Sequence, residues 1–398
     1  MHNGEPDIPI VAAMPVANEI HPTATPQTAN SSILEKGRSS RIVVPQSSGK
    51  HLHDREISAL QSQGYPTGLI HALERNVQLF PLRIWVVDNS GSMSAGDGNR
   101  IVETKSKKDV KLVRCTRWAE IQETVNYHAQ MAALLAAPTV FRLLNDPGAV
   151  VGPQQFSIAE RGIELIQEDL RVARTTMANA TPTGVTPLAE HVMEIRANVM
   201  AMKDALRQNG QKVTIVLATD GLPTDQYGVS GYQANHEFES SLRSLEGLPV
   251  WIVIRLCTDQ ELVTNYYNGL DSQLELSLEV LDDFFGEAEE VSKYNKWLNY
   301  ALPIHRIREL GFHSRLFDML DERKLTLDEV RELLILLFGP DRFDGVPDHH
   351  TDFEGFLKKV DRIVSYEPKQ WNPATKKMQR WIDLKRVKKA YSNECCIM

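Results

Sequence analysis

The chain has 398 residues, of which 42% are hydrophobic, and its 52 acidic and 44 basic side chains give a net charge of −8. This composition predicts a globular protein of two or three domains with a sizeable core, and the lack of any run of about 18 apolar residues argues against a membrane span. Four cysteines, two of them at the C-terminus, provide no disulfide framework and fit a reducing compartment.

Residues 1–50 are rich in Pro, Thr, Ser, Gln and Asn, and we expect them to form a disordered tail. An apolar stretch at residues 8–17 contains two prolines and follows acidic residues, which is unlike a signal peptide. Residues 51–80 predict a short helical lead-in, because Leu69, Leu73 and Val77 recur at helical spacing.

From residue 81 to residue 300, the apolar pattern predicts strands that alternate with helices of 10 to 20 residues. This alternation predicts an α/β fold with a doubly wound, mostly parallel sheet flanked by helices. Apolar runs predict strands at residues 84–87, 139–144, 213–218 and 250–256, and helices are expected at residues 117–136, 159–174 and 187–208.

Three short segments carry oxygen-bearing side chains at the ends of these elements. The first strand leads into Asp88-Asn89-Ser90-Gly91-Ser92, Thr186 precedes a helix that begins with Pro187, and Asp220 follows another strand. Singly, each segment is typical of a turn or of a helix N-cap, and we expect Thr186 to cap its helix. Together, they predict a site at the carboxyl edge of a parallel sheet.

The candidate ligands favour a hard divalent cation. Asp88, Ser90, Ser92, Thr186 and Asp220 offer only oxygen atoms, which suits Mg²⁺, or alternatively Mn²⁺ or Ca²⁺. Two carboxylates and three neutral hydroxyls leave some positive charge unneutralised and one coordination position open. An anion would fill that position.

These segments resemble the von Willebrand factor A domain and its metal-ion-dependent adhesion site. The resemblance implies a Rossmann-like fold in which Ser90 and Ser92 bind the cation directly and Thr186 joins them in the ligand-engaged state. It also implies that Asp88 and Asp220 supply negative charge, directly or through water. In this family the open position takes a carboxylate, so we expect a protein partner that presents an acidic side chain.

One segment departs from the family pattern. Residues 94–115 separate the Asp-x-Ser-x-Ser loop from the next helix and carry a cluster of basic side chains, namely Lys105, Lys107, Lys108, Lys111 and Arg114. Two interpretations remain open: a basic loop beside the metal that helps to select an acidic ligand, or a solvated surface insertion.

Residues 301–366 predict a purely helical region, in which residues 317–334 and 351–360 are similar to the flanking helices of EF-hands. An EF-hand loop needs acidic or amide side chains at positions 1, 3 and 5 and Gly at position 6. A loop beginning at Asp318 has Leu320 and Arg323 at positions 3 and 6, so we expect no calcium binding there.

Residues 367–398 form a basic tail that ends in Cys395-Cys396-Ile397-Met398, a C-a-a-X box that predicts prenylation of Cys395 by farnesyl. If the last three residues are retained, Cys396 is a candidate for palmitoylation. One lipid chain binds membranes only marginally, and a polybasic patch is a common second signal. The patch predicted here comprises Lys376, Lys377, Arg380, Lys385, Arg386, Lys388 and Lys389, with Trp381 as an interfacial ring. The acidic body argues against nucleic acid as a partner.

The sequence therefore predicts a cytoplasmic binding or adaptor protein, peripheral on the cytosolic face of a membrane, that engages a partner through a divalent cation. One alternative is a scaffold with a silent metal site that binds through its helical region or its tail. A metal-dependent hydrolase or phosphotransferase using Asp88 is disfavoured, because the motifs include neither a general base nor a phosphate-binding loop. We expect no enzymatic activity.

Overall fold

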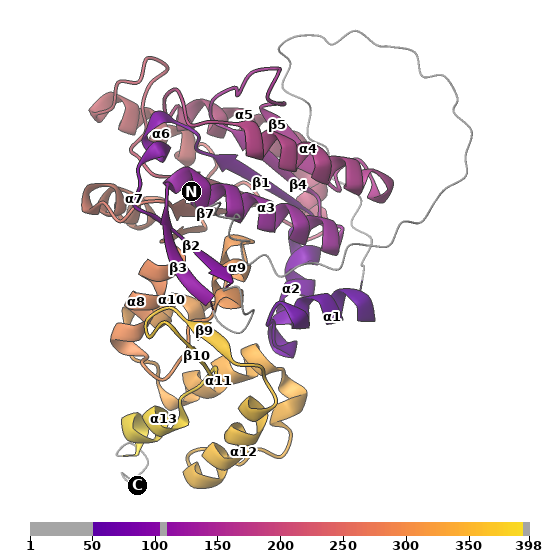
Figure 1. Cartoon of the computed structure of the whole chain (residues 1–398), viewed down its shortest axis with the longest axis vertical. Helices are drawn as coiled ribbons and strands as arrows, with labels where there is room; N and C mark the ends of the chain where they lie inside the picture. Colours follow the sequence, from indigo (N-terminus) through magenta and orange to yellow (C-terminus); the bar gives the residue numbers. More distant parts are fainter. Residues whose placement is uncertain (1–50, 104–109, 393–398) are drawn as a thin grey trace, which may run out of the picture.

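The computed structural model describes residues 51–103 and 110–392, so the predicted N-terminal tail lies outside the described residues. A six-stranded sheet with strand order β5-β4-β1-β6-β7-β8 lies in the upper part of Figure 1. Neighbouring strands run parallel except for β5, which is antiparallel to β4. The strands are β1 (Leu82–Val87), β4 (Thr139–Leu143), β5 (Gln155–Ile158), β6 (Val213–Thr219), β7 (Val250–Leu256) and β8 (Leu278–Leu281). The predicted mostly parallel α/β sheet is confirmed.

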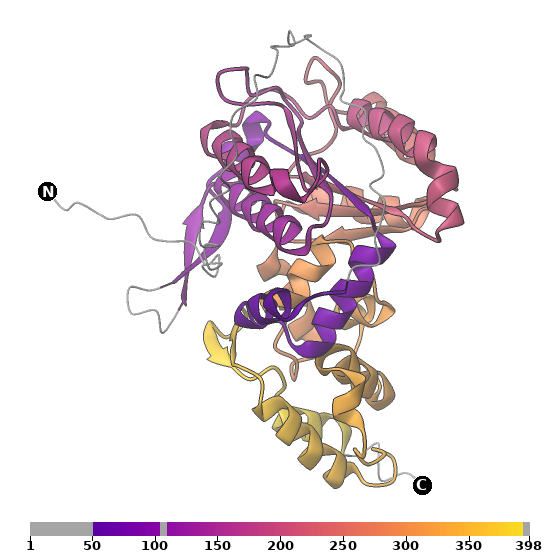
Figure 2. The same cartoon turned by 90° about the vertical axis from the view of Figure 1, so that its right-hand side faces the viewer.

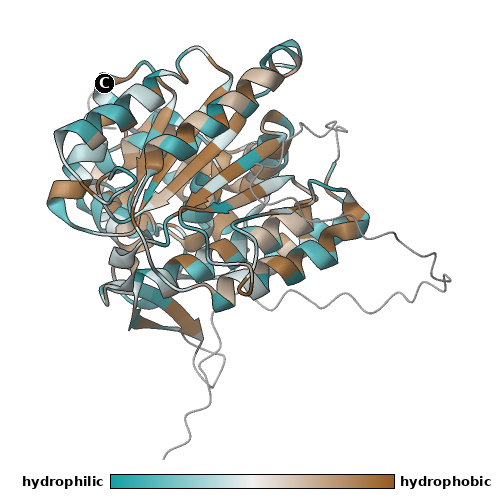
Figure 3. Ribbon diagram, turned by 90° about the horizontal axis from the view of Figure 1, so that it is seen from above, coloured by the Kyte–Doolittle hydropathy of each residue, from teal (hydrophilic) through white to brown (hydrophobic). Residues whose placement is uncertain are grey.

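The sheet is buried on both faces, which explains its continuous apolar strands. Along β1, Ile84 and Val86 face one core while Trp85 and Val87 face the other. Figure 3 shows largely hydrophobic strands between helices that alternate hydrophilic and hydrophobic residues. Helices on one face are α5 (Leu188–Gln208), α6 (Tyr232–Arg243) and α7 (Glu261–Gln273), and those on the other are α3 (Arg117–Leu135) and α4 (Ile166–Asn179). The sheet is therefore doubly wound, as predicted.

One predicted helix begins later than expected. The sequence favoured a helix at residues 159–174, whereas α4 begins at Ile166 after the short 3-10 helix η2 (Ile163–Leu165). Ala159 and Gly162 have φ angles of 59° and 111°, which no helical residue adopts. The buried Asp169 accepts hydrogen bonds from the Ala159 backbone and the Arg161 guanidinium, and this holds the turn.

The lower part of the molecule in Figure 1 has its own hydrophobic core. Its helices are α1 (Asp54–Ser62), α2 (Thr67–Leu79), α8 (Phe284–Tyr294), α9 (Leu302–Glu309), α10 (Arg315–Glu322), α11 (Leu327–Phe338) and α12 (Phe353–Ser365), with the 3-10 helix η3 (Pro340–Phe343). Residues 323–326 join α10 to α11, and this connection is too short to form a twelve-residue calcium loop. None of the described helices is both long and apolar enough to cross a lipid bilayer.

The basic C-terminal segment is folded over most of its length. It forms a hairpin of β9 (Gln370–Asn372) and β10 (Lys377–Gln379), followed by α13 (Leu384–Tyr391). Trp381 is fully buried against Phe338, with ring centroids 6.3 Å apart. The expectation that Trp381 is an interfacial ring is therefore wrong, because its indole belongs to the core.

Buried ion pairs connect the sheet to the helical region. Glu309 of α9 lies 2.8 Å from His128 of α3 and 2.8 Å from Arg306, and Arg255 of β7 contacts both Glu309 and Glu120. The neighbouring cations and imidazoles hold the pKa of Glu309 well below its usual range, although burial acts in the opposite direction. Moving α9 away from the sheet would separate these charges and leave some of them buried without a partner, which is strongly unfavourable. The network therefore holds α9 against the sheet.

Candidate metal centre at the sheet edge

The first loop of the predicted site is shaped by the carboxylate of Asp88. The backbone N–H of Asp88 donates to the carbonyl of Ala218 on β6, which extends the strand pairing by one residue. Its Oδ1 then accepts a 2.8 Å hydrogen bond from the backbone N–H of Ser90. Ser90 precedes the 3-10 helix η1 (Gly91–Ser94), and the Oγ atoms of Ser90 and Ser92 lie 3.0 Å apart.

The adjacent strand β6 brings the second carboxylate to the same edge. Ser92 Oγ donates to Asp220 Oδ1 across 2.7 Å, and Thr219 Oγ1 donates to Asp88 Oδ2 across 2.7 Å. Asp88, Ser90 and Asp220 are buried. One chain of hydrogen bonds thus links four of the five candidate ligands.

The loop that carries Thr186 lies alongside the first loop. The N–H of Thr183 donates to the carbonyl of Asn89 across 2.7 Å, and the N–H of Gly91 donates to the carbonyl of Gly184 across 3.3 Å. Asn145, which follows β4, bonds to both loops: its N–H donates to Asn89 Oδ1 and its Nδ2 donates to the carbonyl of Val185. The sequence analysis did not identify Asn145, although a polar amide residue just after a buried strand could have indicated it.

Thr186 does not cap the helix that follows it. The N-cap of α5 is Pro187, and the N–H of Leu188 bonds to the Thr186 carbonyl instead. The predicted capping role is therefore wrong. The Thr186 backbone bonds to Thr224, 3.0 Å in each direction, while its hydroxyl has no hydrogen-bond partner within the described parts of the chain. That hydroxyl is free to bind another group.

Negative charge accumulates at this edge. Burial raises the pKa of Asp88 to about 6, and the nearby charge of Asp220 adds to the shift, although hydrogen bonds from Thr219 and Ser90 oppose it. A buried carboxylate that resists ionisation in this way is stabilised by a nearby cation.

Arg117 supplies one such cation. Its Nη1 donates to Asp220 Oδ2 across 2.8 Å, and its Nε donates to Asp97 Oδ1 across 2.7 Å. The guanidinium lowers the pKa of Asp97 in turn. The sequence analysis did not identify Arg117. It is a basic residue in the first turn of a helix, where the helix dipole disfavours positive charge, and this unfavourable position could have indicated a carboxylate partner.

The insertion at residues 94–115 forms a hairpin beside α3. Its strands β2 (Gly98–Glu103) and β3 (Val110–Cys115) pair antiparallel and stand at the edge of the molecule in Figure 2. Val102 is fully buried, and Glu120 of α3 accepts a 2.9 Å bond from the Asn99 backbone. The hairpin is therefore partly buried rather than a wholly solvated insertion. Lys105, Lys107 and Lys108 lie outside the described residues.

The donor atoms at the edge fit a hard cation. The polar contacts of Asp88, Ser90, Ser92 and Asp220 involve oxygen atoms, backbone amides and the Arg117 guanidinium, with neither imidazole nor thiol among the described residues. Ser90, Ser92 and Thr186 are the residues that would hold Mg²⁺, Mn²⁺ or Ca²⁺ directly. Asp88 and Asp220 would supply negative charge to the cation, directly or through water.

The predicted basic patch is only partly available to an anionic surface. Arg380 pairs with Asp361, Arg386 with Asp383 and Lys388 with Glu354. Exposed lysines without an ion pair to any described carboxylate are Lys376, Lys377, Lys385 and Lys389. Cys395 and Cys396 lie outside the described residues.

Comparisons with known proteins identify no family. No family model matches the chain, and no curated protein matches it. Solved structures that match include a mutant of the PilB minor pilin from Streptococcus sanguinis, at 13% identity and a TM-score of 0.34, over 52% of this chain. The match spans 57% of that pilin chain.

Proposed function

We propose that this protein is a binding module of the von Willebrand factor A type, which captures an acidic group of a partner protein through a divalent cation. Two sets of hydrogen bonds carry this proposal: Thr219 bonds to Asp88, and Ser92 bonds to both Ser90 and Asp220. These bonds bring together two carboxylates and two hydroxyls from separate loops at one edge of the sheet. The unengaged hydroxyl of Thr186 lies on a loop that is bonded to the other two.

The charge of the site favours an acidic ligand. Three neutral hydroxyls around a divalent cation leave positive charge that the two carboxylates do not fully cancel locally, and a carboxylate from a partner would complete its coordination. Mg²⁺ is the cation that we propose, with Mn²⁺ or Ca²⁺ as substitutes. The role of this chain is to position the cation and to leave one position open for the partner.

Binding is favoured over catalysis because Asp88, whose pKa burial raises to about 6, would spend its charge on the cation, and no imidazole or thiol among the described residues contacts the proposed ligands. His191, one turn into α5, bonds to the Leu144 carbonyl across 3.1 Å, and burial lowers its pKa. General acid–base catalysis requires a titratable group within hydrogen-bond reach of the reacting atoms. We therefore propose no enzymatic activity.

We further propose that prenylation of Cys395 tethers the protein to the cytosolic face of a membrane. Figures 1 and 2 place α13 at the opposite end of the molecule from the sheet. A hollow between the β9–β10 hairpin, α13 and α8 is lined by Lys296, Lys369 and Lys385. Its lining also includes Arg380 and Arg386, which pair with Asp361 and Asp383 there. An anionic headgroup surface would add to the marginal affinity of one lipid chain. The sheet edge would then face away from that surface.

A pull-down experiment tests the proposed function. The full chain is immobilised and exposed to cytosolic extract in Mg²⁺ or in EDTA, alongside Asp220→Ala and the matched surface variant Asp204→Ala. We expect a set of proteins that wild type and Asp204→Ala retain in Mg²⁺ and release in EDTA, and that Asp220→Ala never retains. Capture that is identical in Mg²⁺ and EDTA would reject metal-mediated binding.

One observation favours a second candidate, a scaffold whose sheet-edge site is silent. Arg117 already places a positive charge on Asp220. If this guanidinium takes the place of the cation, the partner binds through the helical region or the C-terminal segment, and the same pull-down shows capture that neither EDTA nor Asp220→Ala changes.

A further inference from the structure

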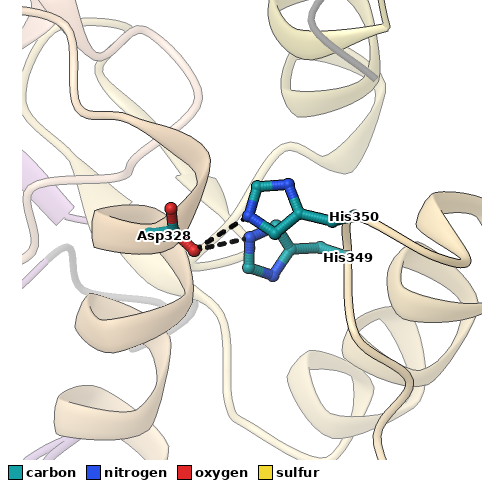
Figure 4. A group of neighbouring side chains, drawn as sticks. All are labelled: Asp328, His349 and His350. Carbon is teal, nitrogen blue, oxygen red and sulfur yellow. Dashed lines mark hydrogen bonds and ion pairs between the residues drawn. The ribbon is translucent and has the colours of Figure 1, made fainter. Parts of the chain in front are cut away.

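Two histidines and one aspartate converge in the helical region, away from the sheet edge. His349 Nε2 lies 2.9 Å from Asp328 Oδ1, and His350 Nε2 lies 3.1 Å from the same oxygen. One ligand atom from each of these residues lies within 4.8 Å of the other two. Figure 4 shows both imidazole rings directed at the carboxylate from the opposite side of a gap between α11 and the segment before α12.

The surrounding structure fixes the backbone at Asp328 and the ring of His349. Asp328 lies in the first turn of α11, whose start is fixed by a capping box between Thr326 and Glu329. The imidazole of His349 is buried beside Phe356, with ring centroids 5.6 Å apart. Its ring centroid lies 4.2 Å from that of His350.

The turn that carries the histidines is also tied to α11. Asp348 Oδ1 accepts hydrogen bonds from the N–H groups of His350 and Thr351, which fixes the backbone next to the rings. Arg331, one turn after Asp328, donates to the Pro347 carbonyl across 3.3 Å. The histidines and the carboxylate are thus presented by two segments that are already bonded to each other.

The charge balance favours a cation between these groups. Asp328 forms ion pairs only with the two imidazoles among the described residues, so no Lys or Arg neutralises its carboxylate there. Its side chain is 65% exposed and that of His350 is 54% exposed, so ions from solution can reach the site. Neutral imidazole nitrogen and carboxylate oxygen are ligands that Zn²⁺ prefers, whereas Mg²⁺ prefers oxygen alone.

We propose that Asp328, His349 and His350 bind a divalent transition-metal ion, with Zn²⁺ the best match. Zinc bonds of about 2.0–2.2 Å in a tetrahedron separate the ligand atoms by about 3.3–3.5 Å. The nitrogen–oxygen distances here are 2.9 and 3.1 Å, so the rings need to retreat by only a few tenths of an ångström. Water would occupy the fourth position on the exposed side. The ion would clamp α11 to the segment that leads into α12.

This zinc site is independent of the proposed sheet-edge cation. The two sites differ in donor chemistry, since one presents imidazole nitrogens and the other presents oxygens only. A measurement with Zn²⁺ therefore tests the helical-region site without depending on the outcome at the sheet edge.

The test measures zinc binding to the full chain after removal of any oligohistidine tag and of bound metal. Stoichiometry and affinity come from competition with a chromogenic zinc chelator. We compare wild type with His350→Ala and Asp328→Asn, both at exposed positions, so neither change opens the core. His51→Ala is the matched control, because His51 is an exposed histidine beside a single carboxylate, Glu74.

We expect wild type and His51→Ala to bind one zinc ion per chain, and His350→Ala and Asp328→Asn to bind it about tenfold more weakly or worse. Zinc at about 100 times the wild-type dissociation constant should also raise the melting temperature of wild type by several degrees, and that of His350→Ala by about half as much or less. A Ser90→Ala/Ser92→Ala variant should keep the zinc response. Equal zinc binding by wild type and His350→Ala, or binding by neither, would show that the three side chains form hydrogen bonds only and would overturn the proposal.

Discussion

Arg117 and Asp220 form a buried ion pair at the edge of the sheet, with the guanidinium Nη1 2.8 Å from Oδ2. The other oxygen of the same carboxylate accepts from Ser92. The pair therefore joins the proposed cation ligands to the first turn of α3 and, through Asp97, to the base of the inserted hairpin. Any cation at the site must share the charge of Asp220 with Arg117.

Replacement of Arg117 should strengthen metal binding while weakening the fold. Arg117→Met removes the competing positive charge, and we expect Mg²⁺ to bind about tenfold more tightly. The substitution also leaves Asp220 unpaired in metal-free protein, which should cost about 3–5 kcal/mol of unfolding free energy in EDTA. Calorimetric titration and urea unfolding measure the two effects. A variant with unchanged or weaker Mg²⁺ affinity would contradict this view of Arg117 as a competitor.

The raised pKa of Asp88 predicts how the metal-free fold responds to pH. The folded state holds this proton up to about pH 6, whereas an unfolded aspartate releases it near pH 4. The free energy of unfolding therefore falls as pH rises from about 4 to about 6, by on the order of 3 kcal/mol, because the folded state must give up a proton that it holds more tightly than the unfolded state does. Asp88→Asn should not show this loss. In EDTA its unfolding free energy, relative to that of wild type, should therefore increase between pH 4.5 and pH 7.5.

Other carboxylates that are buried or half-buried titrate in the same direction, which makes a matched comparison necessary. Burial raises the pKa of both Glu287 and Asp321 to about 7. Both remain in the Asp88→Asn variant, so the difference between variant and wild type isolates Asp88. Asp204→Asn, at an exposed position on α5, controls for the charge change and should follow wild type. If Asp88→Asn also follows wild type at both pH values, Asp88 is not strained by its burial.

Gly184 should be required for the geometry of the Thr186 loop. Its φ angle is +84°, and an added Cβ would lie 2.3 Å from Asn145 Oδ1. Gly184→Ala must shift the Asn145 side chain, which bonds to both loops, and should cost about 1–3 kcal/mol of unfolding free energy. We also expect Mg²⁺ affinity to fall. Gly96→Ala, where a Cβ meets open space, is the control and should match wild type in urea unfolding and in titration.

The proposed anchor predicts a change in fractionation. Cys395→Ser removes the only prenyl acceptor of the C-a-a-X box, and one lost lipid chain leaves the basic patch as the sole membrane signal. We expect the variant to move from the membrane pellet to the supernatant of a lysate. Cys115→Ser is the control, since Cys115 lies within β3. An unchanged distribution of Cys395→Ser would end the idea of a lipid anchor.

The sheet and its edge were predictable because their signals are local. Buried parallel strands are continuous apolar runs, and β1, β4, β6 and β7 all lie where such runs occur. The edge strands β5 and β8 were missed because each has only four residues, and β8 includes Glu279, whose charge is satisfied by Arg308 from α9 across 2.8 Å.

The remaining features depend on contacts between distant residues. Arg117 and Asp220 are 103 residues apart, and the sequence around each of them does not predict that they pair. The C-terminal segment has a tail-like composition, yet Trp381 and Tyr391 are fully buried. The histidine pair becomes a candidate metal site only because Asp328, 21 residues earlier in the sequence, folds against it.

Metal binding at the sheet edge is the central claim, and a thermal melt tests it most directly. The protein truncated before Cys395 is melted in Mg²⁺, Mn²⁺, Ca²⁺ and EDTA together with Ser90→Ala/Ser92→Ala, which keeps every carboxylate and removes two proposed ligands. Saturating cation at about 100 times its dissociation constant stabilises by about 2.7 kcal/mol, which corresponds to a rise of several degrees. We predict this rise for wild type and none for the double variant. Melting temperatures that no cation raises, or that rise equally in both proteins, would contradict the account.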